Sequence, residues 1–151
     1  MKEKMTNKRI DCREKGQSLV ELSLTMVLIL TLLAGAVDLG SAFFDYIALR
    51  DAAQEGALYG SINPTDTSGI ILHIQQSSTA PIDFANDPNF HTPVITITGA
   101  ACAGGATNGE IKVNVSYTYH LTMPFIGVIL GRQTIDLSAH VTDTILTPKC
   151  P

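Results

Sequence analysis

One uninterrupted apolar segment, Leu19–Val37, constrains this chain more than any other feature of its sequence. Glu21 is the only ionisable residue in the segment, and no proline interrupts it. Nineteen helical residues at 1.5 Å each extend about 28 Å, close to the hydrocarbon thickness of a bilayer. Three hydroxyl groups within it can bond back to helix carbonyls, those of Ser23, Thr25 and Thr31. The segment therefore predicts one membrane-spanning helix.

The net charge of the chain changes sign at this segment. Residues 1–16 contain six basic and three acidic residues, a net of +3, and residues 17–151 contain four basic and eleven acidic residues, a net of −7. Basic residues that flank a spanning helix stay on its cytoplasmic side. We therefore expect residues 1–16 to be a cytoplasmic leader and residues 61–151 to be an extracytoplasmic domain. The acidic domain lacks the basic patch that nucleic-acid binding needs.

Glu21 is the fifth residue after Gly16, at which the basic leader ends. An acid inside a lipid segment costs roughly a few kcal/mol, so it marks a function by default. One interpretation is an acid tolerated near the cytoplasmic end, where it snorkels or is protonated. The other is a registry residue, which pairs with a newly freed amine at Gln17 of a neighbouring copy.

The helical pattern continues to Gly60 without a proline, so we expect one long helix over residues 17–60, with residues 19–37 in the membrane. Aromatic residues at 43, 44 and 46 suit the outer membrane interface. Small residues then recur at every fourth position and let another backbone approach closely: Ala48, Ala52, Gly56 and Gly60. This small-residue stripe packs either on the chain's own domain or on neighbouring subunits.

The remaining sequence predicts a small domain with one short helix and three strands. Thr65 or Asp66 can cap a helix over Thr67–Ser77, and residues 78–93 are typical of a loop. Alternating or β-branched residues predict strands over Val94–Thr98, Glu110–Leu121 and Thr134–Leu146. The apolar stretch between the last two, 123–131, is either a helical turn folded onto the sheet or an exposed patch that touches lipid or a partner.

These elements together predict an α+β fold. A long N-terminal transmembrane helix extends into a small extracytoplasmic domain with a three-stranded antiparallel sheet. Such a sheet alone is marginally stable, so its apolar face needs a cover. The outer half of the long helix is the expected cover.

No pattern in the sequence indicates an enzyme active site or a cofactor site. HExxH, P-loop, GxSxG and dinucleotide-binding glycine motifs are absent. In a hairpin centred near Gly127, His140 would pair near Asn114 and away from His120, so we expect no metal site. The exported cysteines, Cys102 and Cys150, are a disulfide candidate, because disulfides persist outside the cytoplasm. The alternative is two unpaired thiols.

A basic leader, a glycine, an acid at the fifth position beyond it and a long apolar helix together resemble the class III signal of type IV-like prepilins. Residues 16–60 resemble the TadE-like pseudopilins of tight-adherence (Flp/Tad) pilus systems, and Pro124–Gly127 fits more loosely. One departure is Leu22, because many of these proteins have tyrosine after the acid.

The resemblance implies a minor pilin-like structural component of a bacterial tight-adherence pilus or related secretion system, in the cytoplasmic (inner) membrane. A prepilin peptidase would cut between Gly16 and Gln17, and Glu21 would carry the family's acid. The implied partners are membrane lipid, this peptidase, other pilin-like subunits and the assembly machinery. Two alternatives stay open: an uncleaved membrane-tethered binding module, and a secreted protein with a conventional signal peptide.

Overall fold

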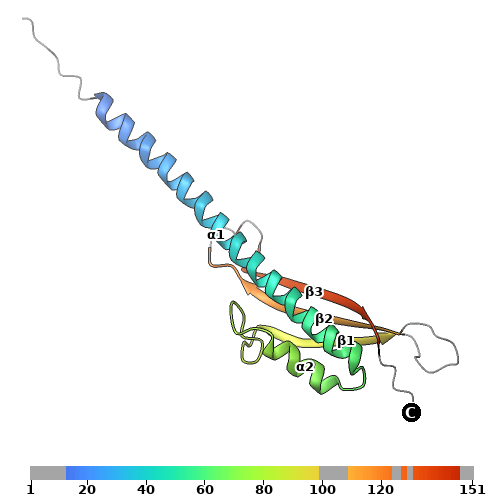
Figure 1. Cartoon of the computed structure of the whole chain (residues 1–151). Helices are drawn as coiled ribbons and strands as arrows, with labels where there is room; N and C mark the ends of the chain where they lie inside the picture. Colours follow the sequence, from blue (N-terminus) through green and yellow to red (C-terminus); the bar gives the residue numbers. More distant parts are fainter. Residues whose placement is uncertain (1–12, 99–108, 124–126, 129–130, 147–151) are drawn as a thin grey trace, which may run out of the picture. The chain divides into compact units, whose positions relative to one another are not determined.

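The structure is a computed structural model, and it describes residues 13–98, 109–123, 127–128 and 131–146. The elements follow the order α1 (Arg13–Ile62), α2 (Thr67–Gln76), β1 (Phe90–Thr98), β2 (Glu110–His120) and β3 (Thr134–Thr144) (Figure 1). The chain divides into two compact units, Met1–Val37 and Asp38–Pro151. The predicted α+β class, with a long N-terminal helix and a three-stranded antiparallel sheet, is confirmed.

Helix α1 is 50 residues long, and it begins before Gln17 and ends two residues after Gly60. In the part of α1 that belongs to the first compact unit, the hydroxyls of Ser23, Thr25 and Thr31 donate hydrogen bonds to backbone carbonyls three or four residues earlier, at 2.8–2.9 Å. This confirms the predicted back-bonding. The helix therefore satisfies these hydroxyls without water, as a helix in lipid requires.

Helix α2 begins at the predicted cap and ends one residue earlier than predicted. A side-chain oxygen of Asp66 accepts a hydrogen bond from the Gly69 backbone N–H at 2.9 Å, which satisfies one of the free donors at the helix start. The buried side of α2 consists of Ile70 and Ile74.

The sheet has the order β1-β2-β3 and both pairings are antiparallel. His140 lies opposite Asn114, so the predicted hairpin register is confirmed. Strand β1 begins at Phe90 rather than Val94, and its register shifts between His91 and Val94, around Pro93. Proline has no N–H to donate to the ladder, so a bulge on an edge strand accommodates it.

The core forms where the second half of α1 runs along the sheet (Figure 1). Its buried residues from α1 are Ala48, Leu49, Ala52, Ala53 and Ala57, and those from the sheet are Ile111, Val113, Val115 and Ala139. The predicted cover for the apolar face is therefore confirmed. Alanines predominate on this side of the helix, which lets it approach the sheet closely.

Two core residues come from the segment that the sequence predicted as a loop. Ile82 and Phe84 are each 1% exposed, and the Phe84 ring contacts the edge of Phe90 with 4.9 Å between centroids. The segment from 78 to 89 contains no strand and no helix, but it closes the core.

Candidate functional site

The membrane segment predicted at residues 19–37 lies within α1 with its apolar side chains exposed. The large apolar side chains in it are 52–67% exposed. Among the described residues, α1 is the one helix long and apolar enough to cross a membrane. Water would be an unfavourable environment for so much contiguous apolar surface, so lipid or other apolar helices must cover it. The segment has the properties of a membrane anchor.

Gly16, Gln17 and Glu21 lie near the start of α1 and are exposed. A Cβ atom added at Gly16 would meet nothing within 4 Å, and the Gly16–Gln17 bond lies within the first turns of α1. No residue in the described part of the chain forms an ion pair or a hydrogen bond with the Glu21 carboxylate. Any protein partner of this carboxylate would therefore come from outside the described residues.

The small-residue stripe faces the chain's own domain. Ala48 is 8% exposed, Ala52 is fully buried, and a Cβ atom at Gly56 would lie 2.6 Å from Cγ1 of Ile74. At Gly60, an added Cβ atom would clash with Cδ1 of Ile111. Of the two interpretations of the stripe, these contacts support packing on α2 and the sheet.

The close approach at Gly56 predicts that Gly56→Ala destabilises the folded unit 38–151 by about 1–3 kcal/mol, because a well-packed core resists extra atoms. The control is Gly40→Ala in the same helix, where an added Cβ meets nothing within 4 Å. This control is expected to be stabilising by about 0.5–1 kcal/mol through helix propensity. Urea unfolding of the full chain in detergent micelles, followed by near-ultraviolet circular dichroism of tyrosine, measures both. Equal changes in unfolding free energy for Gly56→Ala and Gly40→Ala would contradict the close packing of Gly56 against Ile74.

Asp38, which follows the membrane segment directly, is buried (4% exposed) and was not singled out from the sequence. Its carboxylate accepts hydrogen bonds from the backbone N–H of Met123 at 2.9 Å and of Thr122 at 3.3 Å. Its carbonyl accepts a hydrogen bond from the Tyr119 hydroxyl at 3.3 Å. One residue of α1 therefore holds the end of β2 and the start of the β2–β3 connection.

Asp45 is a second buried acid that sequence reasoning missed. Burial, and secondly the charge of Asp87, raise the pKa of the Asp45 carboxyl above its ordinary value of 3.8. Burial and the same Asp87 charge raise the pKa of Tyr117 to about 12, so its hydroxyl stays protonated and donates to Asp87 at 3.2 Å. A signal was available in the sequence, because Asp38, Asp45 and Ala52 are spaced by seven and share one helix face.

The raised pKa of Asp45 predicts a pH-dependent effect of Asp45→Asn. A carboxyl that binds its proton more tightly when folded destabilises the domain at neutral pH, and stability is regained as pH falls through the folded pKa towards 3.8. Asp45→Asn is therefore expected to be more stable than the parent at pH 7, with a difference that shrinks as pH falls towards 3.8 and is lost below it. Thermal unfolding at several pH values tests this, and a pH-independent difference would contradict it.

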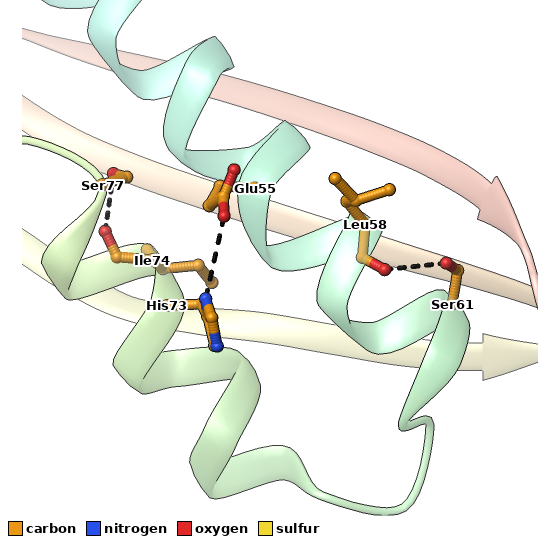
Figure 2. A network of polar contacts seen from close by, with 6 residues as sticks. All are labelled: Glu55, Leu58, Ser61, His73, Ile74 and Ser77. Carbon is orange, nitrogen blue, oxygen red and sulfur yellow. Dashed lines mark hydrogen bonds and ion pairs between the residues drawn. The ribbon is translucent and has the colours of Figure 1, made fainter.

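A polar network joins α1 and α2 on the surface of the second unit (Figure 2). Nδ1 of His73 lies 3.7 Å from Glu55, and the Tyr59 ring stacks on His73 with 4.1 Å between centroids. The Tyr59 hydroxyl donates to the capping carboxylate of Asp66 at 2.9 Å. Beside this network lies an open hollow of about 430 Å³, lined by Asp51, Glu55, His73, Gln76 and Ser77. The network ties α2 to α1.

Two other histidines, His91 and His120, form side-chain contacts at the sheet. His91 contacts the Thr118 hydroxyl at 2.9 Å, and His120 contacts the Asn89 side chain at 3.2 Å. Within the described ranges, no group of three or more His, Cys, Asp or Glu residues could hold a metal ion. The disulfide candidate, Cys102 and Cys150, lies outside the described residues, as do positions 124–126 of the apolar stretch.

Comparison with known proteins gives a match for one segment of the chain. No curated protein and no solved structure matches the chain. The model of the TadE-like protein family matches residues 16–58, which begin at the glycine of the predicted processing site and end within α1. The resemblance predicted from the sequence is thereby confirmed: over residues 16–58 the chain matches the TadE-like proteins, a family of components associated with tight-adherence (Tad) pili.

Proposed function

We propose that this chain is a minor pilin-like subunit, or pseudopilin, with a structural role in assembling a tight-adherence pilus or related secretion machine. One observation carries the proposal. A helical segment with exposed apolar side chains holds a single acid, Glu21, with no partner among the described residues, five residues after an exposed glycine. The match to TadE-like proteins begins at that glycine and supports the proposal.

The proposed mechanism begins with insertion and processing. The apolar segment inserts α1 into the cytoplasmic membrane, with the basic leader inside and the acidic domain outside. A prepilin peptidase then cuts the Gly16–Gln17 bond. Cleavage removes the net charge of +3 carried by residues 1–16 and creates an amine at Gln17, four residues from Glu21. The mature chain thus begins with both charges that docking requires.

Docking follows from the energetics of an acid in lipid. An unpaired carboxylate in a spanning helix costs about 2.5–3.5 kcal/mol at the helix centre on insertion scales and less near the helix end, where Glu21 lies. Pairing Glu21 with the Gln17 amine of a neighbouring subunit compensates for this cost. The two groups meet only when the two helices are shifted along their axes by one particular distance. The pair would therefore set the register of adjacent subunits, while the exposed leucines and valines of residues 19–37 supply the contact area.

The subunit contact belongs to the membrane segment rather than to the small-residue stripe. The stripe is buried against α2 and the sheet, so its residues are unavailable to a neighbour while the domain is folded. The segment 19–37 is exposed except at Ala34 and Gly35, which are half-buried. Lipid covers it before assembly, and helices of other pilin-like subunits replace the lipid during assembly.

A genetic complementation experiment tests the proposed function. In a bacterium with a tight-adherence system, removal of this chain is expected to abolish surface pili, and re-expression of the full chain is expected to restore them. The matched control is a chain truncated after the membrane segment, which should leave the cells without pili although it inserts. Normal piliation without the chain would contradict a role in assembly and favour a tethered binding module.

A further inference from the structure

Two adjoining hollows lie on the second unit, between α1 and the end of α2 with the segment that follows it. The smaller hollow, of about 250 Å³, has apolar residues from both sides in its lining, namely Phe44, Ile47, Ala80 and Pro81. The larger is the hollow of about 430 Å³ beside the polar network of α1 and α2 (Figure 2). Asp51 and Ser77 line both hollows, so together they form one groove, which we call the α1–α2 groove.

The larger half of this groove attracts positive charge. Asp51 and Glu55 supply two carboxylates there, and Gln76 and Ser77 belong to the C-terminal end of α2. The free carbonyls at a helix C-terminus carry partial negative charge, so they favour a cation as the two acids do. Among the described residues that line the two hollows, none is a lysine or an arginine. The groove therefore suits a partner that presents a basic side chain together with an apolar one.

The chain itself carries such a pair on the neighbouring side of α1. Phe43 is 60% exposed, Arg50 is also exposed, and no described acid forms an ion pair with Arg50. These two residues are seven apart, which puts them on one side of the helix and about 10 Å apart along its axis. Phe44 and Asp51 of the groove have the same separation. A second α1 that runs in the same direction therefore matches both halves of the groove at once.

We propose that a second copy of this chain docks the side of α1 that carries Phe43 and Arg50 into the α1–α2 groove. The Arg50 guanidinium of one copy contacts the Asp51 and Glu55 carboxylates of the other, and the Phe43 ring covers the apolar half. The two surfaces differ and lie about 100° apart around α1, so the contact is heterologous. Such a contact repeats from copy to copy, into a ring or a filament.

This contact goes beyond the proposed function, which assigns subunit docking to the membrane segment. It requires two copies of the chain in one membrane, but it requires neither cleavage after Gly16 nor a complete pilus. The experiment below therefore uses a bacterial host without pilus genes and without a prepilin peptidase. Its failure would remove the groove contact and leave the role in pilus assembly to be decided by complementation.

Photocrosslinking of the full chain in bacterial membranes tests the contact. The photocrosslinker p-benzoylphenylalanine replaces Phe43, and irradiation is expected to give a product that contains two copies of the chain. The matched control carries the same photocrosslinker at Val94 of β1, which is likewise exposed (59%) but belongs to neither surface. The control is expected to give several times less product. Equal yields at the two positions, or a product formed only with a different protein, would overturn the proposal.

Charge reversal separates the groove contact from association of the membrane segments. Arg50→Glu in the chain with the photocrosslinker at position 43 is expected to lower the yield about tenfold, because like charges then face each other. The matched control, Lys112→Glu, makes the same change of charge at an exposed position of β2 and is expected to leave the yield unchanged. Equal yields from Arg50→Glu and Lys112→Glu would overturn the role of Arg50.

A mixture of two variants tests the heterologous arrangement. The Arg50→Glu chain keeps an intact groove, and a chain with Asp51→Arg and Glu55→Arg keeps an intact docking side and carries the photocrosslinker at position 43. The second chain alone is expected to give little product. Co-expression is expected to restore a product that contains one copy of each, identified by different epitope tags. No recovery in the mixture would overturn the heterologous contact.

Discussion

Glu21→Gln is expected to lower incorporation of this chain into surface filaments by about tenfold to a hundredfold without preventing its insertion or cleavage. Glutamine has nearly the same shape as glutamate but no charge, so it cannot form an ion pair with the Gln17 amine of a neighbour. A hydrogen bond to a charged group contributes about 1.5–3 kcal/mol, and each 1.4 kcal/mol is a factor of ten in an equilibrium constant.

The measurement is the ratio of this chain in sheared filaments to the same chain in the membrane fraction, by immunoblot. The matched control is Thr25→Val, which removes another polar group from the same segment. The Thr25 hydroxyl donates within its own helix, to the Glu21 carbonyl at 2.8 Å, so it is not needed between subunits. The control is expected to assemble normally. Equal incorporation of Glu21→Gln and the parent would contradict the registry role.

Phe84→Ala is expected to lower the unfolding free energy of the folded unit 38–151 by about 3–5 kcal/mol, the usual range for deleting a buried aromatic ring. Phe84 is 1% exposed and contacts Phe90 at the start of β1, so its loss leaves a cavity between the 78–89 segment and the sheet. A small domain is often stable by only about 5–15 kcal/mol, so this single change should unfold a substantial share of molecules at growth temperature.

The matched control is Phe44→Ala, because the Phe44 side chain is 65% exposed. It is expected to change stability by no more than about 0.5 kcal/mol. Urea unfolding of full-length chains in detergent micelles, followed by tyrosine circular dichroism, compares the two. Similar effects of the two substitutions would mean that the 78–89 segment is not part of the core.

The sequence alone predicted correctly the elements in which apolar residues recur at a regular spacing. Strands β2 and β3 alternate over their full length, and this alternation with one turn between them fixes a single register, in which His140 lies opposite Asn114. Asp66 is a standard helix cap and was predicted as one of two candidates. The long helix followed from the absence of proline over residues 17–60.

The errors arose where tertiary contacts outweigh local composition. The loop predicted for 78–93 is correct over 78–89 and wrong over 90–93, where Phe90 begins β1, and the composition did not indicate that Ile82 and Phe84 enter the core. Two isolated apolar residues have no period to recognise. Asp38 was missed because its partners are backbone N–H groups more than 80 residues away, which no side-chain pattern reveals.

The contacts within the folded domain do not test the roles assigned to Gly16, Gln17 and Glu21. Their positions in α1 leave them exposed and available, but processing and pairing involve other molecules. The small-residue stripe is the opposite case. Its spacing suited internal and intersubunit packing equally, and the contacts of Gly56 with Ile74 and of Gly60 with Ile111 distinguish the two.

The most direct test is the N-terminal sequence of the full chain recovered from membranes, with and without a co-expressed prepilin peptidase. The proposed function predicts a mature chain that starts at Gln17 when the peptidase is present and at Met1 when it is absent. A chain that keeps Met1 in both samples would contradict processing, and a start beyond Val37 would indicate a conventional signal peptide.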